Sequence, residues 1–397
     1  MWFRSRKLYD RFEGGVPAVI EVTVAWTEYF IHKKGVIQMP DIYKNRLARL
    51  RDKMKQNNID GALVTERVSY MYMSGFTGTS AILFIDQNRA ALLTDFRYVE
   101  QASSQSPDYE IIQYRGSQFD EINRLIEEDG VRNLSFEDSR MTYAEYSEYR
   151  EKLKANEFLP LGRVLEELRI IKDESEIDVI RQAVRIADNV FSHILEYIKP
   201  GVSEIELAAE MEHEMRREGA IGSSFDTILA SGLRASMPHG VASEKKIEAG
   251  DVITLDFGAL YKGYCSDMTR TVFLGKPDPE LARIYKIVLE ANQLGLDTVK
   301  SGMTGREVDA VVRKFISDAG FGDNFGHGLG HGVGLEIHED PTLSLRGNLV
   351  LKEGMIVTIE PGIYVTGLGG VRIEDMVAVG ADKNSILTTS TKEMIVL

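Results

Sequence analysis

The sequence has little cysteine, no long apolar run and fewer basic than acidic residues, and each shortage excludes a class of protein. A single cysteine, Cys265, excludes an intramolecular disulfide and fits a reducing compartment. The lack of any run of about eighteen apolar residues argues against a transmembrane helix. With 47 basic and 61 acidic residues, the net charge of −14 disfavours nucleic acid and anionic membranes as partners. We therefore expect a cytoplasmic protein that binds neither.

The first 38 residues differ from the rest of the sequence. They begin with a basic segment, but the apolar stretch that follows contains two glutamates and no small-residue cleavage site, so it is a poor signal peptide. The codons for residues 33–36 would resemble a bacterial ribosome-binding site just upstream of Met39, where the first helical pattern begins. We therefore expect translation to start at Met39 and residues 1–38 to be a non-native or disordered extension. N-terminal sequencing that finds Met1 in the native protein would refute this expectation.

The remaining sequence predicts two domains of an ordinary globular protein, because 43% of the 397 residues are hydrophobic and both charges are mixed throughout. Residues 39–170 alternate between helical and strand patterns, starting with a helix at 41–57 and a strand at 61–64. Such alternation predicts an α/β sandwich. This first domain contains no histidine and no catalytic pattern. A polar segment at 172–176 leads into a long helix, and we place the second domain at 171–397.

The last third of the chain carries four carboxylates and one imidazole within apolar, glycine-rich segments. Four carboxylates gathered in such a setting repel one another and are poorly solvated unless cations hold them. Oxygen ligands with a single imidazole suit hard or borderline divalent ions such as Mn²⁺, and two ions balance this much charge better than one. The sequence therefore predicts a two-metal hydrolase with the ligands Asp256, Asp267, His331, Glu360 and Glu374.

The spacing of the two aspartates fits a β-hairpin. Residues 255–267 have the pattern of two strands joined by a tight turn. With Tyr261 and Lys262 as the two-residue loop, Asp256 lies directly opposite Asp267, and their Cβ atoms are about 5 Å apart. Unpaired like charges in these positions destabilise a hairpin, so this pair indicates a bound cation.

The two glutamates fit a second hairpin, whose midpoint at Gly367 allows Glu360 to oppose Glu374. Arg372 shares the face of Glu374, because side chains alternate along a strand. The plain alternative is that each carboxylate is an ordinary polar strand residue. That alternative stays open for any single one, but both hairpins together with the histidines favour the metal site.

The second domain contains a faint internal repeat. The segment around Ser203 returns 101 residues later around Thr304. In both copies a glycine turn follows one helix and a capping box, completed by Glu206 or Glu307, begins the next. Each helix pair is followed by one of the two hairpins. We therefore expect two α-α-β-β halves related by a pseudo-twofold axis, with the hairpins face to face and the metals between them.

These motifs resemble those of the "pita-bread" metallopeptidases, specifically the Xaa-Pro branch that includes prolidase and aminopeptidase P. The first domain resembles the creatinase-type N-terminal domain of the same branch, with residues 94–98 as its clearest marker. The resemblance covers about residues 41–397, and residues 1–38 match nothing in it. The matching segments of the second domain are residues 230–232, 238–240, 255–271, 325–335, 337–339, 359–364 and 370–375.

The resemblance implies a role for each candidate ligand. Asp256 binds one of two divalent ions, Asp267 and Glu374 bridge both, and His331 and Glu360 complete the second. The metals are expected to be Mn²⁺, with Co²⁺, Zn²⁺ or Fe²⁺ as alternatives. Glu360 also assists deprotonation of the attacking water.

The resemblance further implies residues that bind the substrate and transfer protons. His239 and His338 match the histidines with both functions, and Arg372 matches a residue that holds the substrate and orients the site. The implied activity is that of an Xaa-Pro dipeptidase, with aminopeptidase P acting on longer Xaa-Pro-Yaa peptides as the alternative. The substrate is a peptide with a free N-terminus and proline at the second position, and the implied assembly is a homodimer.

Several residues keep two interpretations. His327 contacts the substrate or has a structural or outer-shell role, and Tyr364 donates to the substrate or closes a strand. A zinc helix bearing His327 and His331 is disfavoured, because five glycines lie between residues 326 and 334. We expect Cys265 to pack rather than to act as a nucleophile. The remaining histidines of the helical segments, His193 and His213, are expected at the surface or in packing.

Three other classes remain as alternatives. A creatinase-like amidinohydrolase or a binding module derived from a peptidase would share the fold, but neither is expected to keep the complete ligand set. A methionine aminopeptidase has the ligands but typically lacks the first domain. Metal dependence separates these possibilities, because chelation should abolish hydrolysis and Mn²⁺ or Co²⁺ should restore it.

Overall fold

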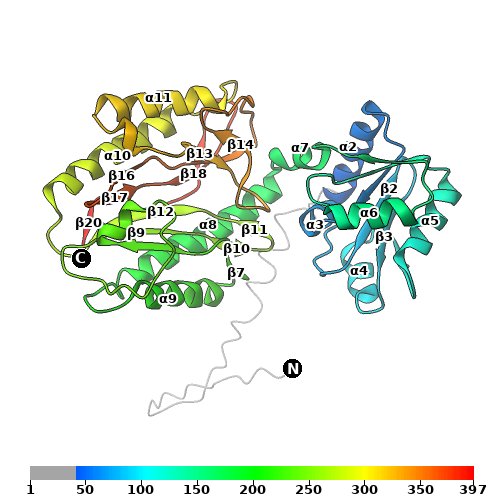
Figure 1. Cartoon of the computed structure of the whole chain (residues 1–397), viewed down its shortest axis with the longest axis horizontal. Helices are drawn as coiled ribbons and strands as arrows, with labels where there is room; N and C mark the ends of the chain where they lie inside the picture. The colour runs from blue at the N-terminus through cyan, green and yellow to red at the C-terminus, as the bar shows by residue number, and fades with distance from the viewer. Residues whose placement is uncertain (1–41) are drawn as a thin grey trace, which may run out of the picture.

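The computed structural model describes residues 42–397, so the expected translation start at Met39 lies outside the described residues. Figure 1 shows two lobes, a smaller one formed by the first part of the chain and a larger one that contains the C-terminus. Within residues 42–397, no helix is long and apolar enough to cross a membrane.

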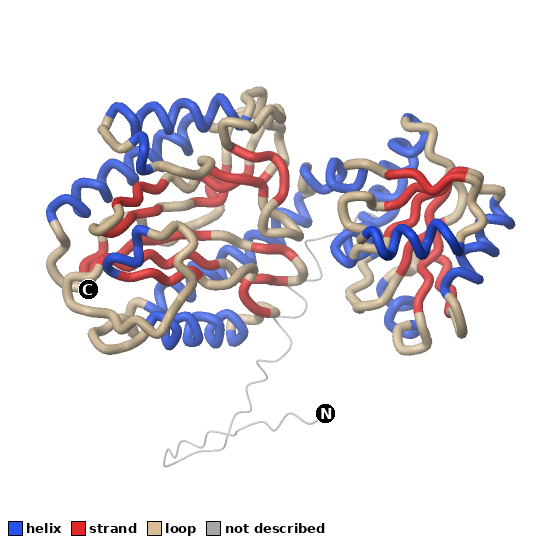
Figure 2. The backbone as a smooth tube through the Cα atoms, viewed as in Figure 1, coloured by secondary structure: helices blue, strands red, loops and turns tan. Residues whose placement is uncertain are grey.

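The smaller lobe is built on a six-stranded mixed sheet in the order β4-β3-β2-β1-β5-β6, flanked by helices (Figure 2). At its centre, β1 pairs antiparallel with β2 and parallel with β5, and all four residues of β1 are buried. A strand covered on both faces has no polar alternation, which explains its short apolar sequence. The elements are α2 (Ile42–Gln56), β1 (Gly61–Val64), α3 (Arg67–Ser74), β2 (Ile82–Asp86), β3 (Ala90–Thr94), α4 (Val99–Gln105), β4 (Glu110–Gln113), α5 (Gln118–Asp129), β5 (Asn133–Phe136), α6 (Tyr143–Lys152), β6 (Glu157–Pro160) and α7 (Val164–Ile170).

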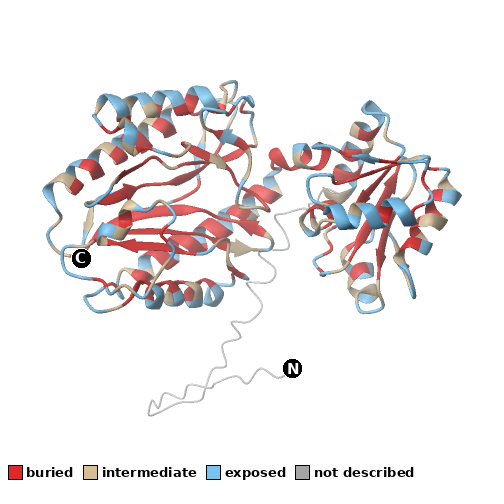
Figure 3. Cartoon of the chain, viewed as in Figure 1, coloured by how far each residue is buried: buried red, intermediate tan, exposed pale blue. Residues whose placement is uncertain are grey.

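In the larger lobe the strands lie between the helix pair α8 and α9 on one side and the pair α10 and α11 on the other (Figure 1). Figure 3 shows these strands as the most buried part of the lobe. A four-stranded sheet has the order β20-β12-β9-β8, and a five-stranded sheet has the order β14-β13-β15-β18-β19. The helices are α8 (Glu174–Ile194), α9 (Glu204–Arg217), α10 (Pro279–Thr298) and α11 (Gly305–Asp318) with the 3₁₀ turns η1 (Gly232–Ser236) and η2 (Gly322–Asn324). The strands are β7 (Gly222–Ser223), β8 (Ile228–Ser231), β9 (Val252–Phe257), β10 (Ala259–Tyr261), β11 (Tyr264–Cys265), β12 (Met268–Phe273), β13 (Gly330–Gly332), β14 (Glu339–Leu343), β15 (Ile356–Ile359), β16 (Gly362–Val365), β17 (Gly369–Arg372), β18 (Asp375–Ala378), β19 (Ser385–Ile386) and β20 (Ile395–Val396).

The predicted repeat is present in the backbone of the larger lobe. Ser203 caps α9 and Thr304 caps α11, each in a complete capping box. Both capping residues also form an isolated β-bridge, Ser203 with Lys246 and Thr304 with Val350. The long helix α8 begins with a further capping box at Asp173, in the polar segment expected to lead into it. The two halves therefore use the same local signals at equivalent places.

The second predicted hairpin has the expected register, but the first does not. Gly362 pairs with Arg372, and Ile359 pairs with Asp375, so the register that lets Glu360 oppose Glu374 is confirmed. In the first hairpin, Asp256 pairs with Thr269 instead of Asp267.

The shift in the first hairpin follows from its turn. The loop is formed by Lys262 and Gly263, whose φ angles are 49° and 87°. A two-residue hairpin loop of this kind needs positive φ at both positions, which glycine adopts readily and an aromatic residue such as Tyr261 does not. The pairing therefore moves by two residues, and a shift of two leaves Asp256 and Asp267 on the same face.

The two lobes are held together by shared apolar packing and by buried ion pairs. One apolar cluster includes Leu50 of α2 together with Ile180 of α8 and Val333 beside β13. The guanidinium of Arg46, in α2, lies 3.3 Å from the carboxylate of Glu176, in α8. The smaller lobe is therefore packed against the larger one rather than tethered by a linker alone.

Candidate metal centre

The structure brings the five predicted ligands together around one cavity of about 270 Å³ in the larger lobe. They arrive from both halves of the repeat, because β9 and the turn before β12 supply the aspartates and the second half supplies the other three. The imidazole lies in β13, and both glutamates lie where one strand pair passes into the next. The residues are Asp256, Asp267, His331, Glu360 and Glu374.

His331 is oriented as a metal ligand would be. Its Nδ1 lies 3.0 Å from the carbonyl oxygen of Gly332, which fixes the proton on Nδ1 and leaves a lone pair on Nε2. That Nε2 lies 3.6 Å from Asp267 Oδ2 and 3.4 Å from Glu360 Oε1. Burial lowers the pKa of His331, which keeps the imidazole neutral and able to coordinate. The zinc helix, which the glycines disfavoured, is excluded because His331 lies in the strand β13.

The carboxylates carry more negative charge than the protein around them compensates. Burial, followed by the neighbouring carboxylates, raises the pKa of Asp267 and of Glu374 well above their usual range. Burial also raises the pKa of Glu360 to about 8, although Arg372 acts in the opposite direction. Buried acids with these shifts are stable as carboxylates only beside added positive charge.

The geometry fits divalent cations. One ligand atom each from Asp267, His331 and Glu374 can be chosen so that all three lie within 4.8 Å of one another. This set combines two carboxylate oxygens with one imidazole nitrogen, a donor chemistry that suits Mn²⁺ and similar ions. Asp256 and Glu360 line the same cavity, where their carboxylate oxygens are further candidate donors. The donor set and the uncompensated charge therefore both agree with a two-ion site.

Arg372 connects the candidate ligands to two other predicted residues. Its Nη2 forms a short ion pair with Asp256 Oδ2, and its Nη1 donates to the hydroxyl of Tyr364 at 2.6 Å. His327 Nε2 lies 3.0 Å from the same hydroxyl, and its Nδ1 lies 2.7 Å from the carbonyl oxygen of Gly328. Burial and then Arg372 lower the pKa of His327 to about 4, so the ring is neutral and accepts from Tyr364. His327, which lines the cavity, is thus linked to Arg372 through the buried hydroxyl of Tyr364.

The two histidines predicted to assist catalysis also line the cavity. The ring of His338 lies edge-on to that of His331, with 4.5 Å between the centroids. Burial lowers the pKa of His338, and the neighbouring rings of His331 and His239 lower it further. Both His239 and His338 are exposed, as residues that meet a substrate need to be.

The rest of the cavity wall is apolar. It includes one aromatic ring, two branched aliphatic side chains and one proline, so an apolar ring can pack beside the carboxylates. These residues come from the loop before β8, from β8, and from the loops that carry His239 and His338. The apolar lining consists of Phe225, Ile228, Pro238 and Ile337.

Two threonines that the sequence patterns did not single out hold the candidate ligands. Thr269 Oγ1 donates to Glu374 Oε2 at 2.7 Å and accepts from Arg372 Nε at 3.0 Å. Thr358 Oγ1 donates to Glu360 Oε1 at 3.1 Å. The available signal was strand alternation, since Thr269 shares the face of Asp267 and Thr358 shares the face of Glu360.

The residues expected to have no catalytic role lie elsewhere. Cys265 is buried, and burial raises its thiol pKa to about 12, which disfavours the thiolate that a nucleophile needs. His193 of α8 lies 2.7 Å from Glu210 of α9. His213 is exposed in α9.

Comparison with known proteins adds a family to this geometry. Residues 178–381 match metallopeptidase family M24, and residues 46–171 match the creatinase/prolidase N-terminal domain. A solved structure described as an Xaa-Pro dipeptidase from Bacillus anthracis is 52% identical with a TM-score of 0.88, covering 89% of this chain and 100% of that chain. An X-Pro aminopeptidase from Thermotoga maritima is 39% identical with a TM-score of 0.83, covering 87% and 100%. The Xaa-Pro dipeptidase of Pyrococcus furiosus is 41% identical, covering 89% of this chain and 100% of its own. The chain therefore belongs to metallopeptidase family M24 and carries the creatinase/prolidase N-terminal domain ahead of its metallopeptidase region.

Proposed function

We propose that the protein is an Xaa-Pro dipeptidase, a dinuclear-metal exopeptidase that hydrolyses the Xaa-Pro bond of dipeptides or short peptides with a free N-terminus. The observation that carries the proposal is the convergence of four carboxylates and one imidazole on a single cavity with an apolar wall. The similarity to Xaa-Pro dipeptidases over 89% of the chain supports the substrate class.

The proposed cofactor is a pair of divalent ions, Mn²⁺ before Co²⁺, Zn²⁺ or Fe²⁺. Asp256 would hold one ion, Asp267 and Glu374 would bridge both, and His331 and Glu360 would complete the second. When bound, such a pair polarises a carbonyl group and lowers the pKa of water toward about 7.

The protein's own groups would position the peptide and move protons. Glu360, whose Oε1 accepts from Thr358 Oγ1, would take a proton from the attacking water. His239 and His338 stand at the open side of the cavity, where they can hydrogen-bond the scissile amide and return a proton to the leaving proline nitrogen. Arg372 keeps Asp256 and Tyr364 in fixed positions, so the substrate meets a rigid wall.

The apolar wall explains why proline is the proposed specificity. An Xaa-Pro bond is a tertiary amide without an N–H, so a site built for it needs no acceptor for that hydrogen. The side chains of Phe225, Ile228 and Ile337 offer apolar contact to a pyrrolidine ring or to the first side chain. The surrounding carboxylates favour a free N-terminal ammonium group, which agrees with an exopeptidase.

A second candidate, aminopeptidase P, is favoured by one specific observation. His338 also lines a second cavity, of about 480 Å³, between the two lobes. Arg140 and Arg163 border this cavity, and each directs one amino group to an acidic partner while keeping other N–H donors. Residues beyond proline in a longer peptide could enter this space, and their carbonyl oxygens could accept from these donors.

A comparison of capped substrates separates the two candidates. A dipeptidase should cleave Ala-Pro well and should lose most activity when its C-terminus is amidated, whereas aminopeptidase P should prefer Ala-Pro-Ala and tolerate amidation. Both should fail on N-acetyl-Ala-Pro. Efficient cleavage of the N-acetylated peptide would contradict the exopeptidase assignment altogether.

The assembly and the compartment belong to the same proposal. The resemblance described above supports a homodimer, and the single buried cysteine suits the cytoplasm. The proposed division places the N-terminal domain at 39–170 and the catalytic domain at 171–397. Light scattering coupled to size exclusion would test the dimer, since a monomeric mass at working concentration would contradict it.

A further inference from the structure

The buried side-chain amide of Asn292 links the two backbone segments that lead into the candidate glutamate ligands. Asn292, in α10, donates from Nδ2 to the carbonyl oxygen of Ile359 at 3.0 Å and to that of Ile373 at 3.4 Å. These residues immediately precede Glu360 and Glu374. A single fully buried side chain therefore sets the separation of the two strands where the ligands begin.

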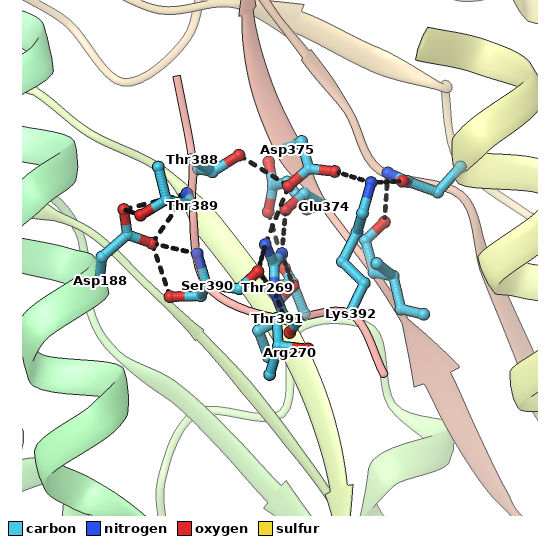
Figure 4. Close-up of polar contacts among 12 residues, drawn as sticks. Asp188, Thr269, Arg270, Glu374, Asp375, Thr388, Thr389, Ser390, Thr391 and Lys392 are labelled. Atoms are coloured by element: carbon cyan, nitrogen blue, oxygen red, sulfur yellow. Dashed lines mark hydrogen bonds and ion pairs between the residues drawn. The ribbon is translucent and has the colours of Figure 1, made fainter. Parts of the chain in front are cut away.

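A residue of the C-terminal segment, defined as residues 388–392, fixes the orientation of this amide. Lys392 donates from Nζ to Asn292 Oδ1 at 2.8 Å, and the same ammonium lies 2.7 Å from Asp375 Oδ2. Because its oxygen is held by Lys392, the amide group of Asn292 presents its nitrogen to both strands. Figure 4 shows Lys392 reaching Asp375 from the C-terminal segment.

Arg270 secures the same strand from its other side. It lies fully buried beside Asp375, with Nη2 2.9 Å from Oδ1, and Nη1 donates to the backbone carbonyl of Glu374 itself. It also donates to the carbonyl oxygens of Ser390 at 2.8 Å and of Thr391 at 3.1 Å (Figure 4). The residue after the ligand and the C-terminal segment are thereby joined through one guanidinium.

The C-terminal segment is anchored in turn to α8. Asp188 accepts from the backbone N–H of Thr389 at 3.0 Å and of Ser390 at 2.8 Å, and from both hydroxyl groups (Figure 4). Thr388 Oγ1 donates to Asp375 at 2.6 Å. The segment is therefore fixed by hydrogen bonds and ion pairs at both of its ends.

We propose that the C-terminal segment 388–392 positions the metal ligands, and that Lys392 is the positioning residue through which it acts. The proposal rests on the dinuclear function proposed above. Removing the ammonium leaves the oxygen of Asn292 unpaired and Asp375 with less positive charge, so the bridge between Ile359 and Ile373 can rotate. Removing a residue that orients metal ligands typically weakens metal binding by about 10- to 100-fold.

The test measures Mn²⁺ binding directly, by equilibrium dialysis of the full chain. Lys392→Met removes the charge at similar length, and Lys392→Arg restores a cationic donor. Lys314→Met is the matched control, because Lys314 forms an ion pair of similar length with Asp318 on the exposed side of α11, away from the cavity. Peptide KM and kcat at saturating Mn²⁺ and the Tm of the metal-free proteins complete the comparison.

We expect the Mn²⁺ dissociation constant to rise about tenfold or more in Lys392→Met, to return to within about threefold in Lys392→Arg, and to stay unchanged in Lys314→Met. Peptide KM at saturating Mn²⁺ should stay near that of the wild type. A Lys392→Met binding curve that matches the wild type, with or without a lower Tm, would overturn the proposal. If that variant does not fold, Lys392→Gln is measured in its place with the same criterion. Wild-type protein that binds none of Mn²⁺, Co²⁺, Zn²⁺ and Fe²⁺ would instead contradict the proposed function.

Discussion

Glu339 forms the centre of a buried charge cluster beside the candidate site, and its replacement gives a quantitative prediction. It begins β14 directly after His338, and its carboxylate lies 2.5 Å from Arg169 Nη2 and 2.9 Å from Lys172 Nζ. All three side chains of the cluster are almost completely buried, with exposures of 6%, 4% and 1%. Since Arg169 belongs to α7 and Lys172 follows it, the cluster joins the segment between the lobes to β14, the strand that directly follows His338.

The size of the effect follows from the pKa of the carboxylate. Burial opposes its ionisation, but Lys172 and Arg169 outweigh burial and lower the pKa of Glu339 to about 2, from an ordinary 4.5. At about 1.4 kcal/mol per pKa unit, the charged form stabilises the fold by roughly 3 kcal/mol at neutral pH. Because the folded-state pKa is depressed, this stability is present above pH 4.5 and is lost as the pH falls toward 2.

The measurement is urea unfolding of Glu339→Gln against wild type. Glutamine keeps the shape and loses the charge, so we expect the free energy of unfolding to fall by roughly 3 kcal/mol at pH 7 and by about half as much near pH 3. Asp318→Asn, which breaks an exposed ion pair with Lys314, should change stability by less than about 0.5 kcal/mol at either pH.

Two results would refute this reasoning. One is a Glu339→Gln protein as stable as the wild type at pH 7, which would mean that desolvation cancels the ion pairs. The other is a stability difference that does not shrink between pH 7 and pH 3, since the loss would then come from packing instead of charge.

Two further predictions concern the candidate site. Asp267→Ala or Glu374→Ala should remove a bridge between the ions and lower peptide hydrolysis by several orders of magnitude, and near-normal turnover in either variant would refute the two-metal mechanism. His239→Ala and His338→Ala should keep the metal content of the wild type while kcat falls by about 10² to 10⁴, the range for positioned proton transfer. Metal missing from purified His338→Ala would mean that this histidine holds an ion.

The sequence was sufficient to predict which residues meet at the site but not how all of them pair. Symmetry about Gly367 gave the register of Glu360 and Glu374 correctly, because Gly367, with a φ of 83°, is the central residue of the loop between Val365 and Gly369. The pairing of Asp256 was misplaced by two residues, since the loop was assigned to Tyr261 and Lys262 when positive φ is required of both loop residues.

Elements without a periodic pattern cannot be located from sequence alternation. The helix α3 buries Tyr70, Tyr72, Met73 and two serines, so it shows no polar face to reveal its period. The short strand β6 and helix α7 complete a sheet edge and an interface, and tertiary packing supplies the stability that their length cannot.

The residues that support the site also could not be predicted from the sequence. Asn292, Arg270 and Lys392 lie far from the glutamates in sequence, and nothing local marks a side chain that bonds to a distant carbonyl oxygen. The residue types of candidate ligands indicate their chemistry in the sequence. The residues that orient them come together only in the folded chain.

The most direct test of the proposed dinuclear centre counts metal ions per chain. The full chain is loaded with Mn²⁺, freed of unbound metal and analysed by inductively coupled plasma mass spectrometry alongside an Ala-Pro hydrolysis assay. We expect two ions per chain, loss of hydrolysis after chelation, and its return when Mn²⁺ is restored. Hydrolysis of Ala-Pro at an undiminished rate by protein that contains no metal would contradict the dinuclear site.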